Sequence, residues 1–221
     1  MAAVKICGLK TLADVALVNQ YLPEYIGFVF ANTKRFVTDT QALTLKQALD
    51  PRIRAVGVFV DEPMEHIINL YHSGIIDIAQ LHGGESETYL EALKQQTNIT
   101  IIKAAKVQSA DQVYQQISQQ ADYMLYDTYK KGELGGTGTR FPLEILEETL
   151  TKLTDQGQTV KPYFIAGGLD AENVEAVIGK MNCYGVDVST GVETGGGKDG
   201  KKIEEFIQAV RNCKGKAPSN R

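Results

Sequence analysis

The sequence predicts a single (β/α)8 barrel, the TIM barrel of the α/β class, and three observations support this. Eight short apolar segments alternate with eight helix-like segments along the chain. The apolar segments are hydrophobic throughout, as is typical of parallel strands covered on both faces. The length of 221 residues lies within the range of one such barrel. An open, doubly wound sheet is the alternative, but it more commonly has fewer strands.

The first half of the chain alternates strand and helix four times. We predict strands at residues 4–7, 25–30, 54–60 and 75–81, which are short runs rich in β-branched and aromatic side chains. Helices are predicted at 11–22, 39–49, from Pro63 to Ser73-Gly74, and at 85–96. Thr11 can cap the first helix with Asp14 as its partner, and Pro63 suits a first helical turn.

The second half repeats the alternation. Strands are predicted at 99–105, 122–126, 162–166 and 185–188, and helices at 110–119, from Pro142, at 170–181 and at 201–213. The glycine-rich segment 130–140 is predicted to be a flexible lid beside Asp127. We therefore expect one catalytic domain over residues 1–213. The polar segment 214–221 has no hydrophobic period, and we expect a disordered tail there.

The charge and composition of the chain weigh against several classes of function. The net charge of −4 and the absence of a long basic block weigh against nucleic acid as a partner. No apolar run approaches the roughly 18 residues that span a bilayer, and no signal peptide precedes the first strand, so we expect a cytoplasmic protein. The odd number of cysteines and the scattered histidines form no disulfide framework and no metal motif, so no metal is expected.

Function in a (β/α)8 barrel gathers where the strands end, at their C-terminal rim. Polar and glycine residues follow most of the predicted strands there. They are Cys7-Gly8, Lys34-Arg35, Asp61, His82-Gly83, Asp127, Gly167-Gly168 and Ser189 to Gly191. Chance placement would leave more of these positions apolar, so this rim is the predicted site.

Two glycine turns at this rim predict a phosphate site. Gly167 and Gly168 separate a strand from a helix, so backbone N–H groups and the helix N-terminus can approach an anion. Ser189 and Gly191 follow the last strand, and the last two loops form the usual phosphate site of this barrel class. The alternative is that these glycines only make tight turns. Residues 135–138 lack the GxxxxGK[ST] and GxGxxG patterns, which favours a small phosphorylated substrate over a nucleotide.

A thiol and a carboxyl lie on different sides of the predicted mouth. Cys7 ends the first strand and Asp127 follows the sixth, so the two can act as base and acid on a ligand between them. Arg35, after the second strand, has the planar guanidinium that binds a carboxylate bidentately. His82 is either a substrate contact or a structural hydrogen-bonding residue.

Several short motifs occur in order along the chain and together resemble one enzyme family. They are Lys5-Ile6-Cys7-Gly8-Leu9, Gly27-Phe28-Val29-Phe30 with Lys34-Arg35, Gln80-Leu81-His82-Gly83, Leu125-Tyr126-Asp127, Gly135-Gly136-Thr137-Gly138, Ala166-Gly167-Gly168-Leu169 and Gly185-Val186-Asp187-Val188-Ser189. The chain is similar to phosphoribosylanthranilate isomerase, a barrel enzyme of tryptophan biosynthesis, over about residues 4–209. Thr33 stands where the family often has Ser, and the run 195–197 leaves the shape of the last loop open.

The resemblance implies an Amadori rearrangement of N-(5-phosphoribosyl)anthranilate to 1-(2-carboxyphenylamino)-1-deoxyribulose 5-phosphate, with no cofactor. It implies that Asp127 is the general acid and Cys7 the general base. Arg35 would hold the anthranilate carboxylate, Asp187 would meet the amine, and the two glycine turns would hold the phosphate. Relatives occur as monomers and as dimers, so we expect a monomer or a homodimer.

Other phosphate-binding barrel enzymes are rival interpretations. Indoleglycerol-phosphate synthase depends on catalytic lysines. Lys103 ends the fifth strand here, but no matching set of Lys and Glu residues accompanies it. The histidine-pathway isomerase uses two aspartates, where this chain has Cys7 and Ala105. A non-catalytic phosphosugar-binding barrel is the alternative of another class. It would keep the glycine turns but would need neither Cys7 nor Asp127.

Overall fold

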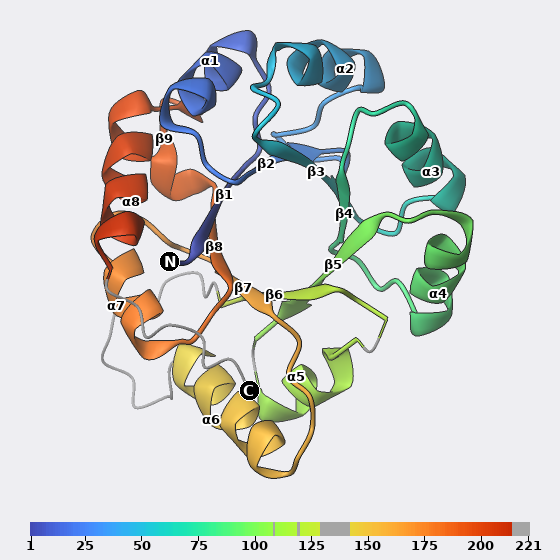
Figure 1. The fold of residues 1–221 in the computed structure, drawn as a ribbon, viewed down its shortest axis with the longest axis vertical. Coiled ribbons are helices and arrows are strands. Elements are labelled where there is room, and N and C mark those ends of the chain that lie inside the picture. The colour runs from blue at the N-terminus through green and yellow to red at the C-terminus, as the bar shows by residue number, and fades with distance from the viewer. Residues whose placement is uncertain (108, 119, 129–141, 214–221) are drawn as a thin grey trace.

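Eight parallel strands form a closed barrel, and the helices surround it (Figure 1). The computed structural model describes residues 1–107, 109–118, 120–128 and 142–213. The strands are β1 (Ala3–Cys7), β2 (Tyr25–Val29), β3 (Arg54–Phe59), β4 (Ile78–Leu81), β5 (Thr100–Lys106), β6 (Tyr123–Asp127), β7 (Tyr163–Ala166) and β8 (Gly185–Val188). Their spatial order follows their order in the sequence, so the predicted fold class is confirmed.

Each strand is followed by a helix on the outside of the barrel (Figure 1). The helices are α1 (Leu12–Tyr21), α2 (Asp39–Ala48), α3 (Met64–His72), α4 (Glu87–Gln96), α5 (Ala110–Gln116), α6 (Pro142–Asp155), α7 (Val174–Lys180) and α8 (Gly200–Asn212). Thr11 and Asp14 form the expected capping box of α1. The polar segment after α8 lies outside the described residues, as does the predicted lid at 130–140.

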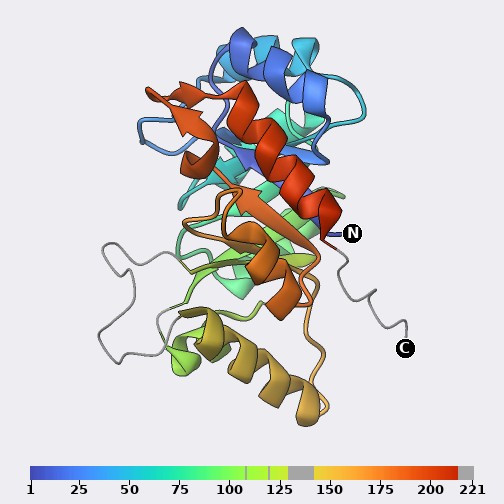
Figure 2. The same cartoon turned by 90° about the vertical axis from the view of Figure 1, so that its left-hand side faces the viewer.

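The barrel closes between β1 and β8, the first and last strands of the chain. Ala3 pairs with Gly185, Lys5 with Asp187, and the register is parallel. This closure places the end of β1 beside the loop that follows β8. Figure 2, turned by 90°, shows the N-terminus next to the C-terminal end of α8.

Successive residues of each strand face opposite sides of the barrel wall. One apolar cluster fills the barrel interior and includes Tyr25, Val56, Ile102 and Leu125, with Ala3 packed against it. A second, larger cluster lies between the strands and the helices and includes Val4 and Ile6. Lys5 and Cys7 alternate with these residues and therefore face the interior with Ala3.

Several predicted boundaries differ from the structure, and the cause is clear at two of them. β4 begins at Ile78 rather than at residue 75, because the N–H groups of Ile75 and Ile76 bond back to Leu70 at the end of α3. α7 begins at Val174 rather than at 170, because the side chains of Asp170 and Asn173 bond to nearby N–H groups and form a turn.

The loop after β8, predicted to be irregular and glycine-rich, contains regular structure. It forms a short 3-10 helix, η1 (Thr190–Val192), and then a two-stranded hairpin of β9 (Glu193–Thr194) and β10 (Gly197–Lys198). Gly195 and Gly196 have φ angles of 62° and 85°, the left-handed conformation that a tight turn of this kind requires. The hairpin brings Glu193 to Arg35 and Lys198 to the Ser189 carbonyl.

Among the described residues, no helix is long and apolar enough to cross a membrane. The described part of the chain also holds no group of three or more His, Cys, Asp or Glu side chains placed to bind a metal ion.

Candidate active site

A buried lysine lies beneath the predicted thiol base. Lys5 is fully buried in the barrel interior, and its Nζ contacts Oδ1 of Asp187 at 3.0 Å. Burial favours the neutral amine, but the charges and hydrogen bonds of Asp187 and Cys7 outweigh it, so the pKa of Lys5 is raised. Lys5 is therefore a charged ammonium inside the barrel.

The Cys7 thiol lies at the end of β1, two residues after Lys5 on the same side of the strand. Burial raises its pKa, and the nearby charge of Asp187 adds to this. The ammonium groups of Lys5 and Lys198 act in the opposite direction and favour the thiolate. Cys7 remains partly exposed at the mouth.

Asp127 ends β6 and lies next to a histidine. Its Oδ2 is 3.9 Å from Nε2 of His82, at the end of β4. Burial lowers the pKa of His82, although the Asp127 charge opposes this, so the imidazole is neutral at pH 7. The Gln80 amide nitrogen lies 3.2 Å from Nδ1 of His82.

The loop after His82 is held by a buried ion pair. Nζ of Lys103 contacts Oε2 of Glu85 at 2.7 Å and also bonds to the Gly83 carbonyl. The Glu85 carboxylate accepts hydrogen bonds from the N–H groups of Asp61 and Gly83. Lys103 follows Ile102, which faces the barrel interior, so it points towards the helices. Its place on the outer side of the wall separates it from Cys7.

Arg35 binds a carboxylate of the protein itself. Its Nε and one terminal nitrogen each bond to Glu193 on β9 at 2.9 Å, a bidentate pair. The same carboxylate contacts Nζ of Lys198 at 2.9 Å, and Lys198 also bonds to the Ser189 carbonyl. Burial of the carboxyl alone would raise its pKa, but Arg35 and Lys198 lower the pKa of Glu193 to about 2.

The loops after β7 and β8 pack directly against each other. A Cβ on Gly191 would run into the carbonyl oxygen of Leu169, so only glycine permits this approach. Gly167 and Gly168 have φ angles of 97° and 64°, which make the turn out of β7. The Ser189 hydroxyl donates to the Cys7 carbonyl at 3.0 Å and so joins this loop to β1.

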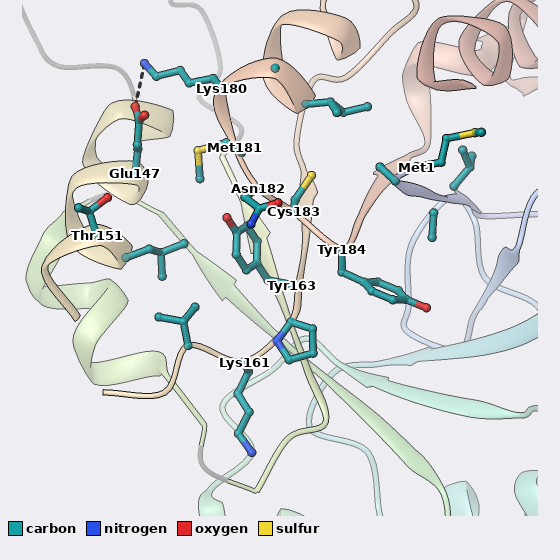
Figure 3. Close-up of a pocket in the computed structure, with 18 of the residues that line it drawn as sticks. Met1, Glu147, Thr151, Lys161, Tyr163, Lys180, Met181, Asn182, Cys183 and Tyr184 are labelled. Atoms are coloured by element: carbon teal, nitrogen blue, oxygen red, sulfur yellow. Dashed lines mark ion pairs between the residues drawn. The ribbon is translucent and has the colours of Figure 1, made fainter. Parts of the chain in front are cut away.

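A pocket of about 900 Å³ opens at the opposite end of the barrel, where the strands begin (Figure 3). Tyr163 at the start of β7 and Tyr184 before β8 line it, and Lys180 contacts Glu147 at 3.4 Å across its edge. The predicted catalytic residues lie at the other rim. This pocket is therefore separate from the candidate active site.

The structure brings the predicted site residues to one rim: Cys7, Arg35, His82, Asp127, Gly167, Gly168, Asp187, Ser189 and Gly191. Lys5, Glu193 and Lys198 also belong to this rim and were not predicted as site residues. Lys5 could have been found, because a lysine inside an otherwise apolar strand is rarely buried without a partner. Glu193 and Lys198 carry no such signal, since the hairpin that positions them was not expected.

Comparisons with known proteins point to one enzyme family. Residues 4–209 match the family model described as N-(5'phosphoribosyl)anthranilate (PRA) isomerase. The N-(5'-phosphoribosyl)anthranilate isomerase of Lachnoclostridium phytofermentans is 44% identical over 209 residues, which cover 93% of this chain and 96% of the relative. The Endomicrobium trichonymphae enzyme of the same name is 41% identical, over 96% of this chain and 100% of its own.

Solved structures of the same enzyme family superpose on this chain. Phosphoribosyl anthranilate isomerase from Thermotoga maritima superposes with a TM-score of 0.81 at 30% identity, over 96% of this chain and 99% of that one. A phosphoribosyl anthranilate isomerase in complex with reduced 1-(o-carboxyphenylamino)-1-deoxyribulose 5-phosphate superposes at 0.79 with 28% identity and the same coverage. Monomers generated from the dimeric Thermotoga maritima isomerase also superpose at 0.79, at 27% identity over 96% of this chain and 99% of that one.

Proposed function

The chain belongs to the N-(5'-phosphoribosyl)anthranilate isomerase family, and we propose that Cys7 and Asp127 are the base and the acid of its reaction. The enzyme converts N-(5-phosphoribosyl)anthranilate to 1-(2-carboxyphenylamino)-1-deoxyribulose 5-phosphate in tryptophan biosynthesis. One observation carries the proposed roles: a thiol and a carboxyl end β1 and β6 at the same rim as the two packed glycine turns. A non-catalytic barrel would not need this pair.

Ring opening is the first step that needs an acid. Asp127 donates a proton to the ring oxygen of the sugar as the bond from that oxygen to C1 breaks. The anthranilate nitrogen supplies the electron pair that forms the C1=N bond. Nε2 of His82 lies 3.9 Å from Asp127, and with its proton on Nε2 the imidazole stabilises the carboxylate that this step leaves behind.

Proton removal is the second step and needs a base. The Cys7 thiolate takes the proton from C2, and the electron pair of the broken C–H bond forms C1=C2 while the C1=N electrons return to nitrogen. The product is an enolamine, which becomes the ketone by moving its hydroxyl proton to solvent and accepting one at C1. The substrate nitrogen is the electron acceptor, so these steps require no cofactor.

Binding groups surround these two residues. The Arg35 guanidinium is placed for the anthranilate carboxylate, and two of its nitrogens already bind Glu193, so the substrate bonds to the remaining donors or displaces that carboxylate. Lys5 contacts one carboxylate oxygen of Asp187, and the other oxygen is placed to accept a hydrogen bond from the anthranilate amine. Backbone N–H groups around Gly167, Gly168 and Gly191, with Ser189, hold the phosphate.

The remaining proposals concern the whole chain. Residues 1–213 form the catalytic domain. The protein acts as a monomer or a homodimer, and a dimeric relative supports the second possibility. A cytoplasmic location is supported by three free thiols, Cys7, Cys183 and Cys213, which suit a reducing compartment.

Replacing each proposed catalytic group tests their roles. Cys7→Ser and Asp127→Asn should each lower kcat by a hundredfold or more, a typical loss for acid–base catalysis, while the circular dichroism spectrum stays native. Cys213→Ser is the matched control, because this thiol lies after α8, away from the mouth, and its kcat should not change. Near-normal turnover in either active-site variant would contradict the assigned role.

A further inference from the structure

Glycine at position 27 leaves room for both an ammonium and a thiol. Gly27 pairs with Cys7 across β1 and β2. A Cβ added there would lie 2.8 Å from Sγ of Cys7 and 3.3 Å from Nζ of Lys5. Both atoms therefore occupy the space that a side chain at position 27 would fill. The two groups are held together on one side of one glycine.

Asp187 holds the ammonium in this space. Its carboxylate contacts Nζ of Lys5 at 3.0 Å, and the two residues are register partners on β8 and β1. An ammonium group has three donors, and this contact uses one of them. The other donors of Lys5 remain available to the sulfur of Cys7.

Three charged side chains face the Cys7 thiol: Lys5, Asp187 and Lys198. Lys198 on β10 already binds Glu193 and the Ser189 carbonyl. Asp187 is an anion and opposes ionisation of the thiol. Lys5 is thus the cation on β1 itself that can compensate the negative charge of a thiolate at this position.

We propose that Lys5 is a positioning residue for the isomerase reaction, whose ammonium, held by Asp187, stabilises the Cys7 thiolate that removes the C2 proton. This inference rests on the proposed role of Cys7 as the base. It gives the buried lysine a function that packing alone does not require. When the thiolate takes the substrate proton and becomes a neutral thiol, Lys5 keeps Asp187 as its counter-ion, so the ammonium stays charged through the turnover.

The first test is alkylation of the free protein by iodoacetamide across pH, with the Cys7 peptide resolved from those of Cys183 and Cys213 by mass spectrometry. Lys5→Met should lower the Cys7 rate at pH 8 by tenfold or more, because the thiolate fraction falls tenfold for each unit by which the thiol pKa rises. Lys103→Met is the matched control. It removes another buried, ion-paired lysine that faces the helices, and the Cys7 rate should stay the same.

A second pair of variants provides a test that does not depend on the folding of Lys5→Met alone. Asp187→Asn removes the competing anion, so the Lys5 ammonium interacts with the Cys7 thiolate alone. The Cys7 alkylation rate should therefore rise. Lys5→Met/Asp187→Asn removes both charges and leaves no unpaired buried ion. Its Cys7 rate should fall at least tenfold below that of Asp187→Asn. Equal rates in these two variants would overturn the proposal.

Kinetics separates this inference from the proposed function. In Lys5→Met, the acid limb of the pH profile of kcat/KM should move to higher pH together with the alkylation midpoint, because the base must lose its proton first. If Cys7→Ser turns over normally, the base assignment itself is wrong. If Cys7→Ser is inactive and Lys5→Met leaves the alkylation midpoint in place, only the role of Lys5 is wrong.

Discussion

Glu193 connects the loop after β2 to the hairpin after β8 through two cations. Its side chain is 11% exposed and pairs with Arg35 and Lys198. The pKa of Glu193 falls from 4.5 to about 2 on folding. Because the folded value is the lower one, the carboxylate stabilises the fold above about pH 4.5, and this contribution is lost as the pH falls towards 2.

Glu193→Gln should therefore destabilise the protein by roughly 2–3 kcal/mol at pH 7, with a smaller deficit at pH 3. Urea unfolding at both values measures the difference. Glu205→Gln is the control, because the pair that Glu205 makes with Lys201 is exposed, so this variant should change the stability little at either pH. A deficit of equal size at pH 3 and pH 7 would show that charge is not the cause. The KM should also rise, because Arg35 loses its anchor.

At the scale of elements, the site depends on how two loops pack. The turn after β7 and the 3-10 helix η1 touch backbone to backbone at Leu169 and Gly191. Backbone cannot yield as the end of a long side chain can. A methyl group at position 191 must push one loop away from the other, and the proposed phosphate site lies between them.

Gly191→Ala should raise the KM for the phosphorylated substrate by tenfold or more and weaken inhibition by inorganic phosphate. Overpacking of this kind costs about 1–3 kcal/mol, so the melting temperature should fall by a few degrees. Gly197→Ala is the control in the same loop, since a Cβ there meets nothing within 4 Å. An unchanged KM in Gly191→Ala would place the phosphate elsewhere.

At the scale of the whole molecule, the Lys5–Asp187 pair joins the first and the last strand of the barrel. The residues are 182 positions apart, and both are nearly or fully buried. Removing one partner leaves a buried charge without compensation, which typically costs about 3–5 kcal/mol. Removing both leaves no such charge. Closure of the barrel therefore depends on the pair acting as a unit.

A double-mutant cycle measures this coupling. Lys5→Met and Asp187→Asn should each lower the free energy of unfolding by about 3–5 kcal/mol, and the double variant should lose clearly less than the sum. The cycle at Lys180 and Glu147, an exposed pair at the other end of the barrel (Figure 3), should show a coupling below about 1 kcal/mol. Additive losses at Lys5 and Asp187 would contradict a coupled buried pair.

Much of the fold and of the site could be predicted from the sequence. Hydrophobic runs and helix caps are local signals, so the eight strands and their order were predictable. The predicted boundaries were wrong at Ile75 and Ile76, and at Asp170 and Asn173, because these residues form turns before the regular element begins. A correctly predicted strand also identifies the residues at its C-terminal end. This is why Cys7, His82 and Asp127 could be assigned to one rim.

The tertiary structure alone decided which of these residues pair. Lys5 meets Asp187 because the barrel closes between its first and last strands, and Arg35 meets Glu193 because an unexpected hairpin after β8 carries that carboxylate. Such contacts join residues 182 and 158 positions apart. Local periodicity shows which side of a strand a residue occupies, but the partner across the barrel depends on closure and register. The charge environment of Cys7 is therefore a property of the closed barrel.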